Sequence, residues 1–532
     1  MPSGNTSSLF YNESMPDDMR QRRQIRTSHM GEPVPPRVEK QQPKPAREWT
    51  KAIVMSIASV TVFVMFALRS KNTYLARKTS DFTTYSKCDL ETYPLWKIDE
   101  AIELNLSDCQ LNTLPDNIEI WSRFKSLKKL DLNSNSLVDL PMAMEAISET
   151  IEILFLSENK FNKVPDVIKK MNKLRVLSMR GNFLTELSSE NLPVSSLVWL
   201  ILTNNKIASI NDNVSNLLYL RKLMLSHNEL DEIPEALGKC EDLELVRLAD
   251  NEIEKIPTKM LLLPRLGWIS LSGNPIFSAN KPSNGEKIIK EKDIEINKSK
   301  ILGQGASGVV YSGKYQGEDV AVKVFKEQSK GSDGNPDDEM SINSIIDNAN
   351  AISAIGVIEE DGKKVMLVMK LLQGTSPLGI VPNFDTVTRD AGPAPLSKTV
   401  VDKNVLLRAI WNIASALEYI HSDIGVSHGD VYLHNVLIDG DKVSRLSDWG
   451  ASFAYDKNFF EQADLIERIE ALAFGRLIED ILAWHPTVIQ KDLFEELLAE
   501  ILQPDVSKRP GFKTIREKLS LIPDMADIVD SK

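Results

Sequence analysis

Cysteine is scarce in this sequence, with only Cys88, Cys109 and Cys240 among 532 residues. Three cysteines cannot build the disulfide framework of a small secreted domain, and their scarcity favours a reducing compartment for most of the chain. A surplus of positive charge is also missing, since the net charge is -12, and this acidity argues against a nucleic-acid-binding protein. The hydrophobic content of 42% is typical of globular domains, and the length predicts several of them.

Residues 1–51 lack the apolar runs that build a core. They are polar, proline-bearing and basic, with RQRRQIR at residues 20–26 and PVPPRVEKQQPKPAR from Pro33. Such a segment cannot bury enough apolar surface to offset the entropy lost on ordering, so we expect a disordered tail. A solvated run of charge explains its basic residues more simply than a specific lipid-binding or partner-binding motif.

Residues 52–68, AIVMSIASVTVFVMFAL, contain no charged side chain. At a rise of ~1.5 Å per residue this segment extends ~25 Å, which is short but sufficient for a single transmembrane helix. A buried core helix fits less well because no domain surrounds the segment, and a cleaved signal peptide fits less well because a long basic tail precedes it. Basic residues balance on the two sides, so charge does not set the orientation. Residues 69–97 then form a juxtamembrane linker.

From about Ile98 the chain repeats itself with an asparagine column whose spacing settles at 23 residues from Asn159 onward, while Cys109 takes the asparagine's place in the first repeat. The column is Asn135, Asn159, Asn182, Asn205, Asn228, Asn251 and Asn274. Together with the pattern LxxLxLxxNxL, as in LKKLDLNSNSL from Leu127, it makes residues 98–280 resemble a leucine-rich-repeat array of about eight units. The resemblance implies an α/β solenoid in which each unit adds a short strand to a concave sheet and turns its leucines inward.

The variable positions between these leucines point out of the concave sheet, because strand side chains alternate. Many of them are apolar: Ile153, Phe155, Val176, Trp199, Ile201, Met224, Leu245 and Trp268. Exposed patches rich in aromatic residues and methionine mark binding surfaces. We therefore name Phe155, Trp199, Met224 and Trp268 as candidate partner-binding residues for a protein substrate or regulator. Packing of this face against another part of the same chain is an equally good alternative.

A charged linker, residues 281–296, leads into a second region that ends near residue 523 and is followed by a short tail, 524–532. Its most informative stretch is GVSHGDVYLHNVLIDGDKVSRLSDWGAS, residues 425–452, which contains Asp430, Asn435 and Asp448. This is the spacing of the protein-kinase catalytic loop and its magnesium-binding turn, so residues 297–523 resemble a protein kinase domain. The resemblance implies an α+β bilobal fold in a multidomain chain.

The kinase resemblance also implies a role for each matching residue. Asp430 would hold the attacking hydroxyl as a catalytic residue, and Asn435 and Asp448 would bind Mg²⁺. Lys323, in VAVK, would be the catalytic lysine that contacts the phosphates of ATP. Glu339 is the ionic partner that we choose for it over Asp337 and Asp338, because of its longer reach. The candidate ATP-binding residues are Gly303, Gly305, Gly308, Val310, Ala321, Lys323, Glu339, Met369, Leu372 and Leu437.

Departures from the common kinase pattern bear on regulation and substrate. Gly429 stands where an arginine usually precedes the aspartate, so no basic group awaits an activation-loop phosphate. Tyr432 stands where serine/threonine kinases usually have a phosphate-contacting lysine, which leaves the substrate class open. Only nineteen residues separate Gly450 from Glu470, where we place the start of the family's central helix, and no APE motif is present. Arg509 therefore loses its usual glutamate partner.

Two functions follow from these features. The first is a membrane-tethered protein kinase that uses ATP and Mg²⁺, modifies a protein hydroxyl and recognises its partner through the repeats. The alternative is a pseudokinase scaffold that binds nucleotide but transfers little. Retention of Lys323, Asp430, Asn435 and Asp448 favours activity, since each is needed for transfer. Because a kinase needs ATP, we expect the repeats and the kinase domain in the cytosol, in a single-pass membrane protein.

Overall fold

The computed structural model describes Cys88 and residues 101–280, 287–305, 307–326, 333–394, 402–458 and 461–529. The chain divides after Thr83 into two units, and all described residues belong to the second, Thr84–Lys532. The basic tail 1–51, the expected span 52–68 and, apart from Cys88, the linker 69–97 lie outside the described residues. Among the helices of the described part, none combines the length and the apolar character needed to cross a membrane.

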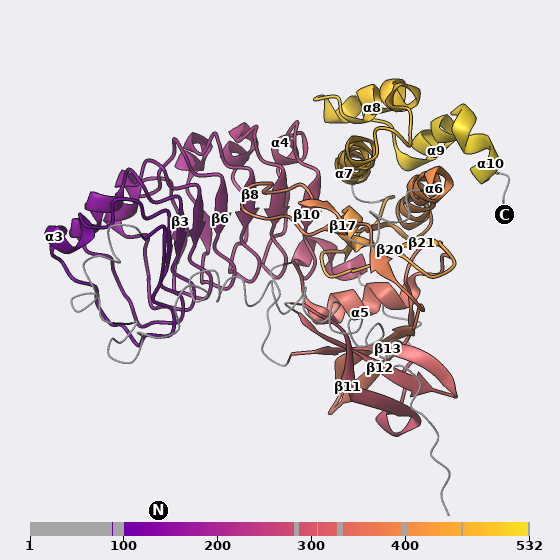
Figure 1. The fold of residues 1–532 in the computed structure, drawn as a ribbon, viewed down its shortest axis with the longest axis horizontal. Helices are drawn as coiled ribbons and strands as arrows, with labels where there is room; N and C mark the ends of the chain where they lie inside the picture. Colours follow the sequence, from indigo (N-terminus) through magenta and orange to yellow (C-terminus); the bar gives the residue numbers. More distant parts are fainter. Residues whose placement is uncertain are drawn as a thin grey trace, which may run out of the picture. The chain divides into compact units, whose positions relative to one another are not determined.

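The repeats build a parallel sheet of eight strands in the order β1-β2-β3-β4-β6-β8-β9-β10 (Figure 1). These strands are β1 (Glu103–Asn105), β2 (Lys129–Asp131), β3 (Ile153–Phe155), β4 (Val176–Ser178), β6 (Trp199–Ile201), β8 (Lys222–Met224), β9 (Leu245–Arg247) and β10 (Trp268–Ser270). The central leucine of one strand pairs with that of the next, as Leu177 does with Leu200, and both are fully buried. Each repeat thus buries its apolar residues against its neighbours.

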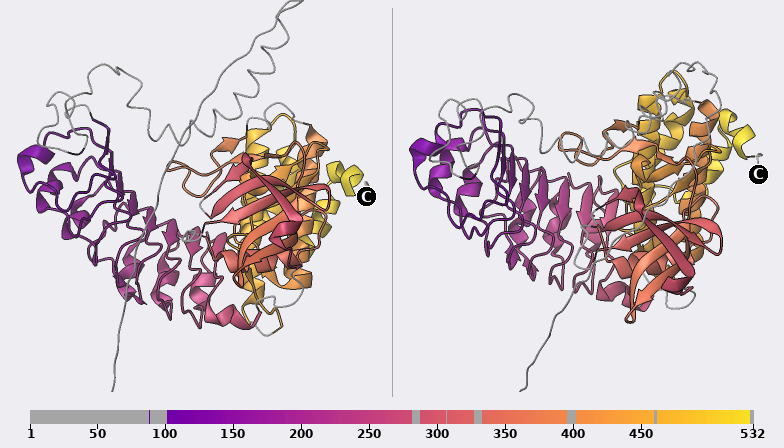
Figure 2. Two further views of the ribbon diagram at one scale, coloured as in Figure 1. Left: turned by 90° about the horizontal axis from the view of Figure 1, so that it is seen from below. Right: turned by 60° about the horizontal axis from the view of Figure 1, so that its bottom comes forward.

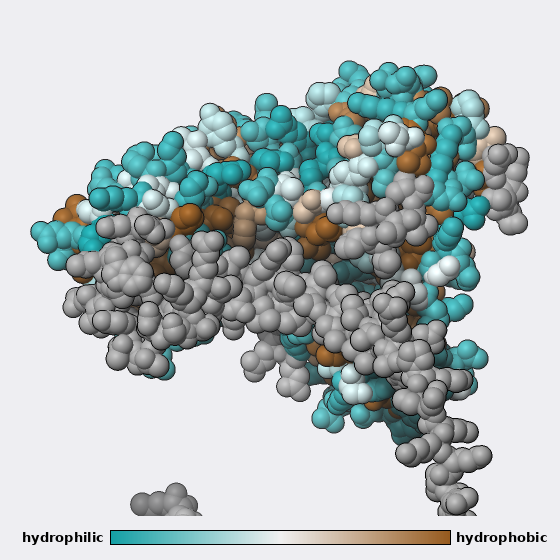
Figure 3. Space-filling view, in the orientation of Figure 1, coloured by the Kyte–Doolittle hydropathy of each residue, from teal (hydrophilic) through white to brown (hydrophobic). Residues whose placement is uncertain are grey.

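Short helical turns follow the strands: α3 (Ile118–Trp121), η1 (Met142–Ile147), η2 (Asp166–Lys170), η3 (Asp212–Asn216), η4 (Glu235–Lys239), α4 (Thr258–Leu261) and η5 (Pro275–Asn280). A two-stranded parallel sheet joins β5 (Glu186–Leu187) to β7 (Ser209–Ile210). In Figure 3 the rim formed by these turns is mostly hydrophilic, whereas hydrophobic residues gather along the row of strands. Large exposed apolar side chains also occur on the turns, as at Ile118 in α3 and Met142 in η1.

The asparagine column forms a buried hydrogen-bond ladder between repeats. Asn182 is representative: its Nδ2 donates to the carbonyls of Leu156 and Met179, each at 3.0 Å, and its Oδ1 accepts from the amide of Phe161 at 3.0 Å. Buried backbone groups need partners, and one side-chain amide supplies three of them at each turn. This requirement explains why the column is asparagine, and the repeat architecture expected from it is present.

Cys88 and Cys109 form a disulfide that ties residue 88 to the first repeat. Cys240 is free and buried in the repeat core, where desolvation raises its pKa to about 11. Low cysteine content correctly excludes a disulfide framework but does not reveal this single bond. Because disulfides persist mainly in oxidising compartments, the bond gives no support to the reducing compartment that cysteine scarcity favours.

A five-stranded antiparallel sheet and one helix form the smaller lobe of the second region (Figure 1). The sheet order is β11-β12-β13-β15-β14, with β11 (Ile294–Gln304), β12 (Gly308–Tyr315), β13 (Glu318–Phe325), β14 (Ala354–Glu360) and β15 (Lys363–Lys370), and η6 (Glu291–Asp293) precedes it. Asp361 and Gly362, which connect β14 to β15, both have positive φ, as is typical of a two-residue hairpin turn. Asn335 caps helix α5 (Pro336–Ile345) by accepting from the amide of Asp337.

The larger lobe is helical, with α6 (Lys403–Tyr419), η7 (Ile420–Ile424), α7 (Ala463–Trp484), η9 (Lys491–Phe494), α8 (Glu495–Ile501), η10 (Val506–Lys508), α9 (Phe512–Ser520), η11 (Pro523–Met525) and α10 (Ala526–Val529). Its short strands are β16 (Ser376–Pro377), β17 (Gly379–Ile380), β18 (Gly392–Pro393), β19 (Val426–Ser427), β20 (Val436–Ile438), β21 (Ser444–Leu446) and β22 (Phe453–Ala454), and η8 (Leu433–Asn435) precedes β20. Helix α7 begins at Ala463, so the expectation that the central helix begins at Glu470 was wrong. The segment after Gly450 is correspondingly shorter.

The last repeats lie beside the helical lobe (Figure 2), and residues of the two parts belong to the same hydrophobic cores. Leu245 and Trp268 of the last strands belong to the core of the helical lobe, while Phe453 and Ile466 of that lobe belong to the core of the repeats. At the same junction, a Cβ built on Gly267 would lie 3.5 Å from the backbone nitrogen of Ala473. The two parts of this unit therefore pack as one body at the C-terminal end of the solenoid.

Candidate active site

The strand pair β20–β21 brings the three motif residues together. Asn435 immediately precedes β20 and Asp448 follows β21, and the antiparallel register pairs Val436 with Leu446. The amide and hydroxyl of Ser447 donate to the Asn435 carbonyl at 2.9 and 2.8 Å. Asn435 Nδ2 in turn donates to the carbonyl and to Oδ2 of Asp430, at 2.9 and 2.8 Å. The side chain of Asn435 thus orients the carboxylate of Asp430.

Asp448 has a φ of +62°, in the left-handed region that aspartate tolerates better than most residues. Its Oδ1 accepts a 3.4 Å hydrogen bond from the amide of Gly450. A Cβ built on Gly450 would lie 3.3 Å from this oxygen and 3.6 Å from Oε2 of Glu339. The carboxylates of Asp448 and Glu339 therefore lie close to each other. A non-glycine residue in this conformation is often found at functional sites.

Lys323 and Glu339 form the ion pair that the sequence analysis chose. Lys323 Nζ lies 2.5 Å from Glu339 Oε1, and the Glu339 side chain is only 4% exposed. Burial lowers the pKa of Lys323, but the charges of Glu339 and Asp448 outweigh it, so the pKa is raised overall. Burial also raises the pKa of Glu339, and Lys323 only partly compensates. The pair joins β13 to α5, which is the connection that the kinase resemblance implies.

The glycine loop lies between β11 and β12. A Cβ on Gly303 or Gly305 would meet no atom within 4 Å, whereas a Cβ on Gly308 would lie 2.4 Å from the Val324 carbonyl. The first two glycines therefore leave space for a ligand, and the third allows close strand packing. The remaining ATP-binding candidates, Val310, Ala321, Met369, Leu372 and Leu437, are all half-buried. Ala321 pairs with Met369 across β13 and β15, which groups them on one side of the sheet.

These residues fit ATP and Mg²⁺. Asn435 has both amide hydrogens engaged with Asp430, which leaves its Oδ1 as a hard oxygen ligand beside Asp448. No group of three or more histidine, cysteine or acidic residues able to hold a metal occurs in the described part. Mg²⁺ commonly takes one or two protein ligands and completes its shell with phosphate and water, so the oxygens of Asn435 and Asp448 would be sufficient to hold it.

Arg247, at the end of β9 in the repeats, reaches the catalytic loop. Its side chain is 2% exposed. Nη1 donates to the Gly429 carbonyl at 2.7 Å, Nη2 donates to Oδ1 of Asp430, and Nε donates to Oδ1 of Asp333 at 3.0 Å. The repeat pattern puts Arg247 at a polar variable position of the concave sheet, but the sequence alone indicates no role for it, because its partners lie far along the chain.

The positive charge of Arg247, from the repeats, is balanced by the carboxylates of Asp333 and Asp430, from the kinase domain. Burial would raise the pKa of Asp430, but Arg247, His434 and His428 together with the Asn435 hydrogen bond lower it. Burial would likewise lower the pKa of Arg247, but Asp430 and Asp333 raise it overall. Lys222, one strand earlier, has its pKa lowered to about 8 by burial and by Arg247. A carboxylate held ionised in this way suits Asp430 for accepting a hydroxyl.

Trp268 covers the residue that replaces the usual lysine of the catalytic loop. Its ring stacks on Tyr432 with centroids 4.7 Å apart and an interplanar angle of 3°, and its Nε1 donates to the Val431 carbonyl at 3.0 Å. The Trp268 side chain is 3% exposed. At Trp268 the concave face therefore packs against another part of the same chain, which is the alternative to partner binding given in the sequence analysis.

The other candidate partner-binding residues lie near a loop of the helical lobe. Phe384, between β17 and β18, packs on the rings of Phe155 and Trp199 with centroids 5.7 and 5.5 Å apart. Trp199 Nε1 donates to Sδ of Met224 at 3.4 Å, and Met224 is buried. The structure thus brings all four residues into contacts within this chain or with one another, while Phe155 and Trp199 remain half-buried.

Glu470 on α7 is a site residue that sequence reasoning missed. It accepts from the amides of His428 and Gly429 at 3.1 and 2.6 Å, from Ser427 Oγ at 3.1 Å, and contacts His421 Nε2 at 2.6 Å. Burial would raise the pKa of Glu470, but His421 and the other donors lower it. One buried carboxylate thus holds the backbone of the catalytic loop. An acidic residue inside an otherwise apolar helix was the available signal.

Arg509, whose family glutamate is absent, donates to three carbonyls instead. They belong to Gln503 at 2.9 Å, Arg468 at 3.5 Å and Pro264 of the repeats at 2.6 Å. Burial lowers the pKa of Arg509 to about 10. The arginine therefore connects the helical lobe to the repeats.

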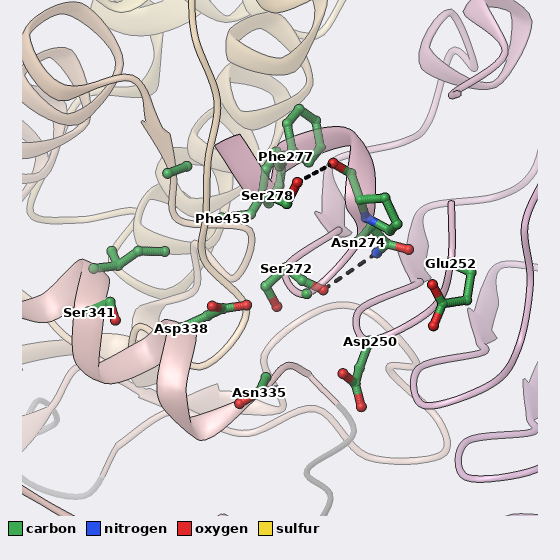
Figure 4. A pocket seen from close by; sticks show the side chains of 14 residues that line it. Asp250, Glu252, Ser272, Asn274, Phe277, Ser278, Asn335, Asp338, Ser341 and Phe453 are labelled. Atoms are coloured by element: carbon green, nitrogen blue, oxygen red, sulfur yellow. Dashed lines mark hydrogen bonds between the residues drawn. The ribbon is translucent and has the colours of Figure 1, made fainter. Parts of the chain in front are cut away.

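A cavity of about 440 Å³ lies next to the active site but is separate from it (Figure 4). Its walls come from the last repeats, through Asp250 and Ser272, from helix α5, through Asp338 and Ser341, and from Phe453 after the magnesium-binding turn. None of the candidate catalytic or ATP-binding residues lines it.

In its two lobes and in the grouping of these side chains, the second region is a protein kinase domain. The protein kinase domain family matches residues 296–460, and the leucine rich repeat family matches residues 125–184 and 195–253. The chain therefore joins a protein kinase domain to leucine-rich repeats.

Individual relatives carry similar names. A probable serine/threonine-protein kinase of Dictyostelium discoideum is 31% identical over 171 residues, which cover 32% of this chain and 11% of the relative. A receptor-like serine/threonine-protein kinase of Arabidopsis thaliana is 26% identical over 236 residues, which cover 43% of this chain and 34% of the relative. A probable LRR receptor-like serine/threonine-protein kinase of the same plant is 26% identical over 222 residues (38% and 23%). The chain thus spans about a third or less of the length of these relatives.

Proposed function

We propose that this chain transfers the γ-phosphoryl group of ATP to a serine or threonine hydroxyl of a protein. Two contacts carry the proposal: the hydrogen bond from Asn435 to Asp430, and the Lys323–Glu339 ion pair, with Asp448 close to Glu339. Serine and threonine are proposed because the matched relatives are named serine/threonine kinases. The half-buried Phe155 and Trp199 are proposed to contribute to protein recognition.

Each residue has a task in this reaction. Asp430 accepts the hydrogen of the substrate hydroxyl and aligns its oxygen, and Asn435 fixes the orientation of the Asp430 carboxylate. Lys323, held by Glu339, contacts the phosphates. Asn435 and Asp448 would hold Mg²⁺, which would supply positive charge to offset that of the phosphates. Positioning and electrostatics supply most of the rate enhancement in such transfers, so the loss of one member affects rate more than fold.

The test is transfer of radiolabel from [γ-³²P]ATP by the full chain to myelin basic protein or to itself. We expect magnesium-dependent labelling of serine or threonine by the parent, and at least a ~100-fold loss for Asp448→Ala with an unchanged far-UV spectrum. Asp441→Ala is the matched control, since Asp441 is an exposed carboxylate in the β20–β21 turn. Equal transfer by parent and Asp448→Ala would refute the assignment, and nucleotide binding without transfer by the parent would favour the pseudokinase alternative.

We also propose that residues 52–68 tether the protein to a membrane, with the repeats and kinase domain in the cytosol. The support is the uncharged apolar run in the sequence and the receptor-like names of relatives. Replacing Val60 and Val64 with lysine introduces two charges at ~2.5–3.5 kcal/mol each on insertion scales, and should release the protein into the soluble fraction. Retention in a carbonate-resistant membrane pellet would exclude this segment as the anchor.

A further inference from the structure

The catalytic loop of this kinase domain lacks both of its usual cations. Gly429 precedes the aspartate in place of arginine, and Tyr432 follows it in place of lysine. A phosphoryl-transfer site concentrates negative charge from the phosphates and from carboxylates, so such sites normally contain cations. Some other group must supply positive charge beside Asp430 if the site is to work in the usual way.

Arg247 of the repeats occupies this place. Its guanidinium spans the Gly429 carbonyl, the Asp430 carboxylate and the Asp333 carboxylate just before α5. The rigid planar fork of arginine suits several simultaneous hydrogen bonds better than lysine does. One side chain from the repeats therefore connects the catalytic loop to the approach to α5, the helix that carries Glu339.

The glycine at position 429 and the arginine at position 247 are complementary. Gly429 has a φ of +71°, and a Cβ there would lie 2.6 Å from the Ile269 carbonyl and 2.7 Å from the Ala451 carbonyl. No side chain fits at this position while the repeats are docked. The Ile269 carbonyl of β10 and the Ala451 carbonyl of the kinase domain thus leave no room for the usual loop arginine, and Arg247 of the neighbouring strand β9 contacts the same loop.

We propose that Arg247 is a positioning residue of the phosphoryl-transfer site and that the last repeats are part of the catalytic unit. This rests on the proposed kinase function. In the reaction, the substrate oxygen bonds to the γ-phosphorus, the bond from that phosphorus to the β,γ-bridging oxygen breaks, the hydroxyl proton passes to Asp430, and ADP leaves. Arg247 acts by holding Asp430 and the loop backbone in place.

Two observations favour positioning over an inhibitory latch. First, each carboxylate oxygen has two acceptor sites. Arg247 donates to Oδ1 of Asp430 and Asn435 donates to Oδ2, so each oxygen keeps capacity for a substrate hydroxyl. Second, a latch must open, whereas this junction is secured by shared core around Trp268, by the Arg509 bond to Pro264, and by the ring contact between Phe277 and Phe453.

The test compares full-length Arg247→Ala and Arg247→Lys with the parent in the same transfer assay. We expect Arg247→Ala to lower kcat about 100-fold, with less than a ~3-fold change in KM for ATP, because the loss is one of alignment. Arg247→Lys should recover part of this, about 10-fold, since it keeps the charge but not the fork. Arg221→Ala is the matched control: Arg221 also bridges repeats and helical lobe, through Glu244 and Thr388, but does not touch the loop. It should retain kcat within ~2-fold.

Hydrogen exchange of the peptide covering residues 426–438 provides a readout that needs no turnover. Protection should fall in Arg247→Ala, recover in part in Arg247→Lys and stay unchanged in Arg221→Ala. A rise in kcat for Arg247→Ala would overturn positioning in favour of a latch, and unchanged kcat would overturn any role at the site. If the parent itself transfers no phosphate, the proposed function fails, and exchange alone decides: unchanged protection in Arg247→Ala overturns the positioning role. If Arg247→Ala does not fold, Arg247→Lys carries the same comparisons.

Discussion

Replacing Trp268 with alanine removes the largest apolar side chain at the junction of repeats and kinase domain. The indole is 3% exposed, stacks on Tyr432 and donates to the Val431 carbonyl. Truncation of a buried tryptophan typically costs about 3–5 kcal/mol of unfolding free energy. The value here should lie in the upper half of that range, because the variant also loses an aromatic pair, ~0.5–1.5 kcal/mol, and leaves a buried carbonyl without its donor.

Urea denaturation of the full chain, followed by circular dichroism, measures this cost. Trp199→Ala is the control: its ring is half-buried against Phe384, so a loss of about 1–2 kcal/mol is expected. Trp268→Phe should lie between the two. A change below ~1 kcal/mol for Trp268→Ala would refute the view that the repeats and the helical lobe are one packed body. In that case a changed set of pull-down partners for the Trp199→Ala, Trp268→Ala double variant would favour partner docking instead.

Three further changes test the electrostatics. Lys323→Met should abolish transfer and lower the free energy of unfolding by about 3–5 kcal/mol, because it leaves Glu339 buried without its partner. Adding Glu339→Met should restore stability in urea but not activity. Recovery of transfer in the double variant would contradict the role of Lys323. Glu470→Leu should cost about 3–5 kcal/mol, because it orphans buried donors of the catalytic loop; Glu470→Gln should cost less, and equal costs would argue against the network. The lowered Glu470 pKa also means that its stabilisation is present above pH ~4.3 and is lost as the pH falls through the folded-state pKa, so Glu470→Gln should flatten the acid denaturation curve. The pKa of Lys222 is about 8 in the folded chain and ~10.4 in the unfolded chain, so between these pH values the unfolded chain binds more protons. The free energy of unfolding of the parent, relative to that of Lys222→Met, should therefore rise from pH 8 to pH ~10.4. A difference that does not change with pH would exclude the lowered pKa.

Local spacing was sufficient to predict the parts of the site that lie close together in the chain. Asp430 and Asn435 are five residues apart, and the short hairpin β20–β21 brings Asp448 back to them. Lys323 contacts Glu339 because helix α5 is the next element after strand β13. The asparagine column likewise has a strictly local cause in the repeat turn. Each of these follows from residue types at fixed short distances.

Contacts between distant segments could not be predicted in the same way. Arg247 and Asp430 are 183 positions apart, and nothing in β9 distinguishes this arginine from other polar concave residues. The start of α7 was misplaced because Glu470 lies inside the helix, facing the loop, rather than at its end. Gly429 was the one local sign of the docked repeats, since its missing side chain makes room for them.

The shared core has a consequence for synthesis of the chain. The strands that carry Leu245 and Trp268 leave the ribosome about 200 residues before Phe474, a core partner on α7. At ~5–20 residues per second, this apolar face stays uncovered for roughly 10–40 s in the nascent protein. During that interval the finished solenoid presents an aromatic surface to the cell, so molecular chaperones are its first expected occupants, before its own kinase domain arrives.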